Sequence, residues 1–131
     1  MERRAAQRAG RSEVRANANV LLTNPEMLHH GILPNHGKWA PFLHRLRLVV
    51  VDELHVLRGV FGTHVAHLLR RLRRLCARYG SDPTFIFSSA TIGEPARLAS
   101  ELCGLDVAEV TDDGSPRGAR VPEHEAALAP R

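Results

Sequence analysis

The sequence predicts an α/β protein built on a parallel β-sheet with flanking helices. Two short apolar runs, residues 48–51 and 84–87, are rich in β-branched and aromatic residues. A long amphipathic segment separates them, with apolar residues at helical spacing. A connection of that length joins parallel strands through a crossover helix, whereas a hairpin needs only a few residues. The sequence therefore favours strands that all point the same way.

Length and composition indicate one domain of ordinary size. The chain has 131 residues, of which 44% are hydrophobic, and no apolar run is long enough to cross a membrane. The opening Met-Glu-Arg-Arg has no apolar core behind it, so it does not read as a secretory signal, and we expect a cytoplasmic protein without a membrane partner. The formal net charge is +4, but Lys38 is the single lysine among 18 basic residues. That arginine bias is typical of GC-rich coding sequence, so charge alone supports a nucleic-acid partner only weakly.

The two cysteines, Cys76 and Cys103, lie far apart and each falls within a predicted helix. Buried thiols of a reduced compartment are the favoured interpretation, and a disulfide is the alternative.

The first half of the chain alternates helical and extended patterns. Residues 2–16 are rich in Arg and Ala and predict a surface helix, and residues 20–23 predict a short strand ended by a turn. Residues 26–30 predict a helical turn, residues 31–37 a loop, and residues 39–46 a helix.

A long helix follows Gly62 and is capped by Gly80. Its arginine-rich face could bind phosphates, although such a face is more often simply solvated. The arginines of this face are Arg70, Arg71, Arg73, Arg74 and Arg78.

The remaining residues predict a second helix, which opens at residues 93–95 and closes at Gly104. Residues 106–110 could form one more strand. Residues 119–131 lose all periodicity and predict an irregular tail.

Charged and polar residues stand at the ends of the predicted strands. The run 48–51 shows no polar alternation, which predicts a strand buried on both faces, and it ends in Asp52, Glu53 and, two residues on, His55. The next strand runs directly into Ser89-Ala90-Thr91. The carboxyl ends of parallel strands meet at one edge, where open α/β sheets bind their ligands. We expect these side chains to converge there, although hydroxyls in such places also serve as turn formers.

These motifs together resemble the first RecA-like motor domain of a DEAD/DEAH-box (superfamily 2) helicase. Asp52-Glu53-Leu54-His55 is similar to motif II, Ser89-Ala90-Thr91 to motif III, and Thr23-Asn24-Pro25 with the residues behind it to the motif Ib region. Three further stretches, 31–34, 58–65 and 112–118, resemble a bacterial DNA-repair branch of these helicases.

The resemblance implies a fold, a domain boundary and a function. The fold is an incomplete RecA-like (P-loop NTPase) parallel sheet with flanking helices. Residues 1–118 would form the C-terminal part of helicase domain 1, and residues 119–131 a tail. The function is ATP-dependent unwinding of nucleic acid, DNA rather than RNA, with ATP and Mg²⁺ as cofactors.

The resemblance also implies a role for each matching residue. Hard carboxylate oxygens suit Mg²⁺, and a general base must reach the attacking water. The implied roles are Asp52 for Mg²⁺, Glu53 as general base, His55, Ser89 and Thr91 for coupling hydrolysis to strand movement, and Thr23, Asn24 and Pro25 for nucleic-acid contact.

One family element is missing from these 131 residues. No Gly-x-x-x-x-Gly-Lys-Ser/Thr loop occurs, and Lys38 lies in His-Gly-Lys-Trp. Without that loop the phosphates of ATP lack their backbone cradle. We therefore expect an internal piece of a helicase, inactive alone, whose other domains lie outside this chain. The alternative is a non-catalytic nucleic-acid-binding or interaction module.

Overall fold

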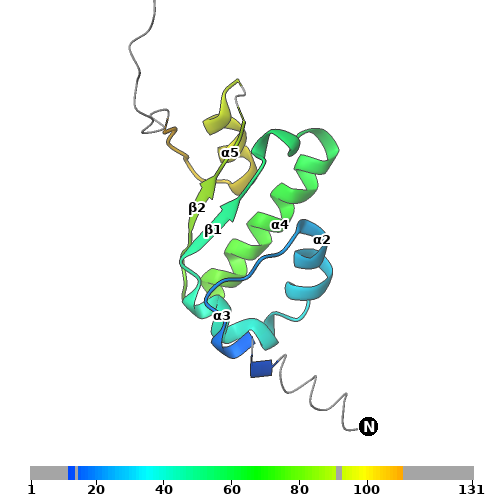
Figure 1. Cartoon of the computed structure of the whole chain (residues 1–131), viewed down its shortest axis with the longest axis vertical. Helices are drawn as coiled ribbons and strands as arrows, with labels where there is room; N and C mark the ends of the chain where they lie inside the picture. Colours follow the sequence, from blue (N-terminus) through cyan, green and yellow to red (C-terminus); the bar gives the residue numbers. More distant parts are fainter. Residues whose placement is uncertain (1–11, 14, 91–92, 111–131) are drawn as a thin grey trace, which may run out of the picture.

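The computed structural model describes residues 12–13, 15–90 and 93–110, and shows one βαβ unit preceded by short helices (Figure 1). None of the described helices is long and apolar enough to cross a membrane. The elements in chain order are α2 (Pro25–Met27), a π-helical turn (Leu28–Ile32), a 3₁₀ turn (His36–Trp39), α3 (Ala40–Arg45), β1 (Leu48–Val51), a 3₁₀ turn (Leu54–Val56), α4 (Gly59–Arg78), β2 (Thr84–Phe87) and α5 (Pro95–Cys103).

The two strands pair in parallel, as the sequence predicts. Leu48 lies opposite Thr84, and Val51 lies opposite Phe87. The 20-residue helix α4 supplies the crossover between them and packs along the sheet (Figure 1).

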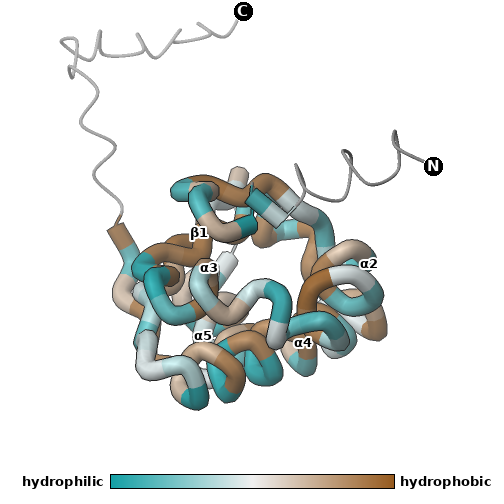
Figure 2. The backbone as a smooth tube through the Cα atoms, turned by 90° about the horizontal axis from the view of Figure 1, so that it is seen from below, coloured by the Kyte–Doolittle hydropathy of each residue, from teal (hydrophilic) through white to brown (hydrophobic). Residues whose placement is uncertain are grey.

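One face of the sheet is covered by α4 and α5. Colours of both extremes alternate around the coil of α4 in Figure 2, as expected for a helix with one apolar stripe. Half-buried residues of the strands, among them Val51, Phe85 and Phe87, pack on this core. The core residues next to them are Leu54, Leu57, Val65, Leu69, Ala99 and Leu102.

A second cluster joins α3 to the C-terminal half of α4. It contains Leu33, Leu43, Leu72 and Cys76, with Val49 of β1 packed against it. Cys76 and Cys103 are both buried and free, which confirms the prediction of thiols. Burial raises the pKa of the Cys76 thiol.

The opposite face of the sheet is open, so the prediction of a strand buried on both faces is wrong. Leu48 is 56% exposed and Val50 is 65% exposed, while their neighbours Val49 and Val51 are half-buried. The four-residue run is apolar on both faces, but no described element covers the outer one. An apolar composition shows that both faces of the strand could be buried, but only one face packs against other described residues.

Two further strand predictions are wrong. Residues 20–23 and 106–110 form no ladder, and Leu22 is 93% exposed. A strand needs a neighbour for its backbone hydrogen bonds, and the described residues offer these segments none.

The helix boundaries shift by a few residues. α4 begins at Gly59 rather than after Gly62, which is buried inside its first turn. A Cβ at Gly62 would collide with the carbonyl oxygen of Leu57, so the close approach requires glycine. The helical turn predicted for 26–30 continues to Ile32, inside the predicted loop.

The glycine cap of α4 is confirmed. Gly80 has φ +79° and donates to the carbonyl of Ala77 at 3.1 Å, while Ser81 donates to that of Cys76 at 2.9 Å. This pair of bonds satisfies carbonyls that the helix end leaves open. Gly104 ends α5 with φ +68°, again as predicted.

Candidate nucleotide-hydrolysis edge

The ends of β1 and β2 meet, so the acidic and hydroxyl residues that follow them share one edge of the sheet. The amide of Ser88 donates to the carbonyl of Val51 at 3.0 Å, and the amide of Leu54 donates to the carbonyl of Ser88 at 2.9 Å. These two bonds extend the parallel ladder beyond the strands and bring residues 52–53 beside residues 88–89. Asp52 and Ser88 therefore meet at this edge. The meeting of Asp52 and Glu53 with Ser89 and Thr91 stays a prediction, because no described contact joins them and Thr91 lies outside the described residues.

Asp52 is held at this edge by two hydrogen bonds to one carboxylate oxygen. The hydroxyl of Ser88 and the amide of Glu53 both donate to Oδ1, the amide at 2.9 Å. The bond from Ser88, followed by that from Glu53, lowers the pKa of this exposed carboxyl below its ordinary value of 3.8. Asp52 is therefore a stable anion at neutral pH.

Glu53 occupies a left-handed backbone conformation, with φ 57° and ψ 44°. Residues other than glycine are uncommon there, and the conformation stores strain next to the carboxylate. The side chain is 61% exposed, so its oxygens are accessible to ligands.

His55 lies beside Glu53. Its Nδ1 is 3.2 Å from Glu53 Oε2, a contact that is an ion pair only when the imidazole is protonated. This nitrogen is buried and makes no hydrogen bond of good geometry. Within the described residues no hydrogen bond joins His55 to Ser89.

The structure describes one of the two predicted coupling hydroxyls. Ser89 is exposed at the end of β2, and Thr91 lies outside the described residues. The hydroxyl that touches the acidic motif belongs to Ser88, which the sequence analysis missed. Its position as the first polar residue after the strand was the available signal.

The predicted nucleic-acid residues form the start of a short helix. Asn24 Oδ1 accepts a hydrogen bond from the amide of Met27 at 2.7 Å, and Pro25 occupies the first turn. Thr23 is exposed. Because residues 20–23 form no strand, these residues do not reach the edge as the end of a third paired strand.

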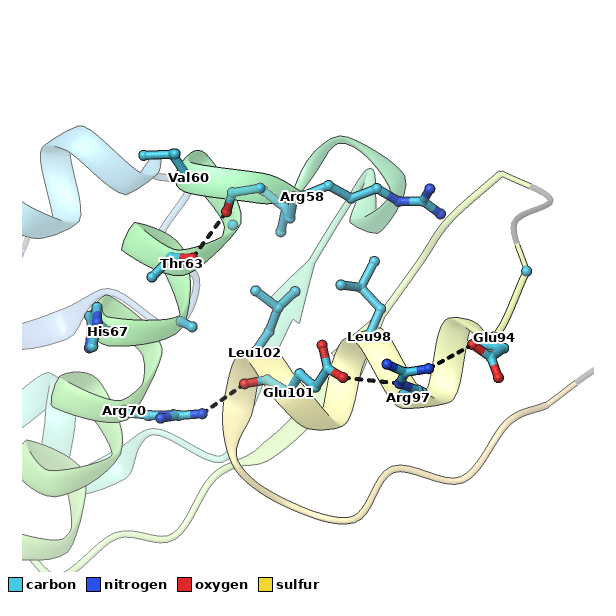
Figure 3. Close-up of a pocket in the computed structure, with 15 residues that line it drawn as sticks. Arg58, Val60, Thr63, His67, Arg70, Glu94, Arg97, Leu98, Glu101 and Leu102 are labelled. Atoms are coloured by element: carbon cyan, nitrogen blue, oxygen red, sulfur yellow. Dashed lines mark hydrogen bonds and ion pairs between the residues drawn. The ribbon is translucent and has the colours of Figure 1, made fainter.

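Two arginines of the arginine-rich face of α4, here called the arginine stripe, make hydrogen bonds that hold the fold together. Arg70 donates to the carbonyl of Glu101 at 2.9 Å (Figure 3), and Arg73 donates to the carbonyls of Cys103 at 2.9 Å and Gly104 at 3.1 Å. Cations at a helix C-terminus satisfy its open carbonyls and its dipole. Only part of the stripe is thus free to meet a polyanion.

An open groove of about 940 Å³ lies between α4 and α5. Leu98 and Leu102 of α5 point into it, and Arg58 reaches over it from the start of α4 (Figure 3). Arg97 bridges Glu94 and Glu101 at 3.1 and 3.0 Å, which raises the pKa of Arg97. Asp52 does not line this groove, so it is separate from the acidic edge.

The fold and the edge define the class of protein. A parallel βαβ unit with carboxylates after one strand and hydroxyls after the next has the arrangement of a ligand-binding edge in an open α/β sheet. Residues 2–98 match the model of the DEAD/DEAH box helicase family. The chain belongs to that family.

Two curated relatives show how much of a helicase these residues represent. The chain is 50% identical over 108 residues to the uncharacterized ATP-dependent helicase YprA of Bacillus subtilis, covering 82% of this chain and 14% of the relative. It is 45% identical over 127 residues to the ATP-dependent helicase HRQ1 of Saccharomyces cerevisiae, covering 88% of this chain and 12% of that protein. The chain thus spans a small part of each relative.

Solved structures of the DUF1998 helicase MrfA are also similar. The complex with DNA and AMPPNP matches with 50% identity and a TM-score of 0.78, over 84% of this chain and 16% of that one. The complex with DNA alone matches with 52% identity and a TM-score of 0.70, over 73% and 13%. The fold prediction, an α/β parallel sheet of RecA-like type with flanking helices, is confirmed.

Proposed function

We propose that this chain is a segment of the first RecA-like motor domain of an ATP-dependent DNA helicase, carrying the hydrolysis box and the coupling motif. Residues 1–118 would form the segment and residues 119–131 a tail. Residues 1–11, 14, 91–92 and 111–131 lie outside the described part. The observation that carries the proposal is the paired edge, where Asp52 and Glu53 follow β1 and Ser88 contacts Asp52.

Asp52 is the residue that fits Mg²⁺. It is an exposed carboxylate whose pKa is lowered by Ser88 and by the amide of Glu53, so it presents hard, anionic oxygen at neutral pH. Mg²⁺ bound with ATP would neutralise charge on the phosphates. Asp52 would hold the ion directly or through a bound water.

Glu53 is the general base in this proposal. Its exposed carboxylate can accept a proton from a water. His55, which contacts Glu53, would transmit the state of the nucleotide towards Ser89 and Thr91.

DNA is the nucleic acid in this proposal because MrfA, a structural relative, is described as bound to DNA. Thr23, which is exposed, and the backbone of Asn24 and Pro25 beyond it would contact phosphates, as the resemblance of these residues to motif Ib implies. Two free buried cysteines agree with a reducing, cytoplasmic location.

The chain alone should hydrolyse ATP only at the background rate, because its 131 residues contain no phosphate-binding loop. Turnover by the isolated chain that Glu53→Gln abolishes would contradict this expectation.

A chimera tests the proposal directly. Residues 15–110 would replace the matching segment of the Bacillus subtilis relative, and DNA-stimulated ATP hydrolysis would be measured beside the parent protein. We expect an active chimera that loses at least about a hundredfold on Glu53→Gln, as for loss of a general base. Thr84→Ala, an exposed hydroxyl at the far end of β2, is the matched control. A folded chimera that binds DNA but never hydrolyses ATP would favour the non-catalytic alternative.

A further inference from the structure

The carboxylate of Asp52 is used asymmetrically. Oδ1 accepts the hydroxyl of Ser88 and the amide of Glu53, whereas Oδ2 accepts no hydrogen bond from any described residue. Within the described part of the chain, one oxygen is therefore committed to the protein and the other is available to a ligand.

Ser88 is itself fixed in place by its backbone. Its amide and its carbonyl are both bonded across to the β1 side, to Val51 and Leu54, at 3.0 and 2.9 Å. The preceding residue, Phe87, is paired with Val51 in the ladder. A hydroxyl carried on such an anchored backbone has few positions, so it can define the orientation of a neighbouring side chain.

We infer that Ser88 is a positioning residue for Asp52, which locks one carboxylate oxygen onto the strand end and leaves Oδ2 as the only oxygen offered to a divalent cation or its bound water. The inference rests on the proposed function, because Asp52 is the cation residue only there.

The physical need for such a residue follows from exposure. Asp52 is exposed, so packing does little to select its rotamer. A free carboxylate would rotate among staggered wells and lose that freedom on binding. The hydrogen bond from Ser88 already restricts the Asp52 side chain in the free protein, so less conformational entropy is lost when a ligand binds. The lowered pKa of Asp52 has the same cause and agrees with the geometry.

The first experiment measures side-chain order without metal. In the isotope-labelled 131-residue chain, kept dilute, the Hα–Hβ couplings of Asp52 should report one χ1 rotamer. Ser88→Ala should average these couplings, and Ser88→Thr, which restores a hydroxyl at an exposed position, should return them. Thr84→Ala is the matched control and should change nothing. Unaveraged couplings in a folded Ser88→Ala chain would overturn the inference.

The second experiment uses Mn²⁺ as the probe for the cation. We expect Mn²⁺ to broaden the amide signals of Glu53, Leu54 and Ser88, and Asp52→Asn to abolish the effect. Ser88→Ala should weaken the apparent affinity by roughly tenfold or more, the size expected when a metal ligand loses one orienting hydrogen bond, and Ser88→Thr should restore it.

The outcomes separate the two claims. Undiminished Mn²⁺ broadening in Asp52→Asn would reject the metal assignment of the proposed function, while averaged couplings in Ser88→Ala would still uphold the positioning role. Unchanged Mn²⁺ affinity in Ser88→Ala, with broadening lost in Asp52→Asn, would reject the positioning role alone. Absence of broadening in the unmodified chain would reject the metal assignment, and the couplings of Asp52 would then decide the positioning role.

Discussion

Arg73 donates a hydrogen bond from Nη1 to the carbonyl oxygen of Cys103, at 2.9 Å, and thereby ties the middle of α4 to the C-terminal end of α5. A second bond from the same nitrogen reaches the carbonyl of Gly104 at 3.1 Å. The guanidinium therefore caps the C-terminal end of α5. Arg73, which the sequence places on a face that could bind phosphates, thus stabilises the packing of α5 on α4.

Arg73→Ala should lower the free energy of unfolding by about 1–2 kcal/mol, because two carbonyls at the end of α5 lose a charged donor in a partly buried place. Urea denaturation followed by circular dichroism would measure the change. Arg74→Ala, an exposed neighbour with no side-chain hydrogen bond among the described residues, should stay within about 0.5 kcal/mol. Equal effects of the two changes would contradict the capping role.

Single-stranded DNA should bind weakly to the isolated chain, with affinity that falls as salt rises and little preference among sequences. Replacing Arg74 and Arg78 together with Gln tests the free part of the stripe, because both are exposed and neither caps α5. Fluorescence anisotropy at several salt concentrations should show weaker binding and a shallower salt slope. Thr23→Ala should weaken binding only modestly.

The control for this DNA experiment is Arg70→Gln, whose side chain is already bonded to the carbonyl of Glu101. It should affect binding less than the exposed pair does. An unchanged salt slope in the Arg74 and Arg78 double variant would mean that the stripe is simply a solvated helix face. Base discrimination that persists at high salt would contradict backbone-directed binding altogether.

Periodicity in the sequence was sufficient to predict β1, α4, β2 and α5, because each combines an apolar pattern with clear turn or cap residues. The position of Asp52 at the same sheet edge as the end of β2 also followed from strand direction. Residues 20–23 and 106–110 failed as strands because strand formation depends on a partner, which local sequence does not contain.

The details of the edge could not be predicted for a similar reason. The left-handed backbone of Glu53 is set by the tight path from β1 into the following 3₁₀ turn, and glutamate gives no sign of it. The contact of Ser88 with Asp52 depends on the register between two strands 36 positions apart. Register is a tertiary property, and the resemblance to motif III pointed to the neighbouring Ser89.

Glu53→Gly should stabilise the fold by about 0.5–1 kcal/mol, because glycine adopts the left-handed conformation without a Cβ penalty. Glu53→Gln keeps the Cβ and the strain, so its stability should match that of the original chain. Thermal and urea unfolding of the three proteins would measure the difference. If Glu53→Gly were no more stable than Glu53→Gln, the backbone at this position would not be strained.

The stability of the chain should depend on pH through Asp52. Hydrogen bonds from Ser88 and Glu53 place its folded-state pKa below the ordinary value of 3.8, so the folded state binds the proton less readily than the unfolded state. The stabilisation is complete above that value and disappears as pH falls through the folded-state pKa. The urea midpoints of the original chain and of Asp52→Asn should therefore converge below pH 3.8. A constant difference between them would contradict this account.

The open face of the sheet should make the isolated chain self-associate. Leu48 and Val50 of β1 and Ile86 of β2 are 56%, 65% and 45% exposed on that face, and both strands have an edge without a described partner. Exposed apolar surface beside free strand edges promotes association. Analytical ultracentrifugation should show a mass that rises with concentration, and Val50→Thr with Ile86→Thr should lower it.

The matched control for this experiment is Val49→Thr, which alters the covered face of the same strand. It should lower stability by about 1 kcal/mol or more without reducing association, because Val49 packs on the core. The outer-face pair should do the reverse, since those side chains contribute little to the core. A concentration-independent monomer with a sharp cooperative melt would show that the exposed face is tolerated, and would refute the prediction.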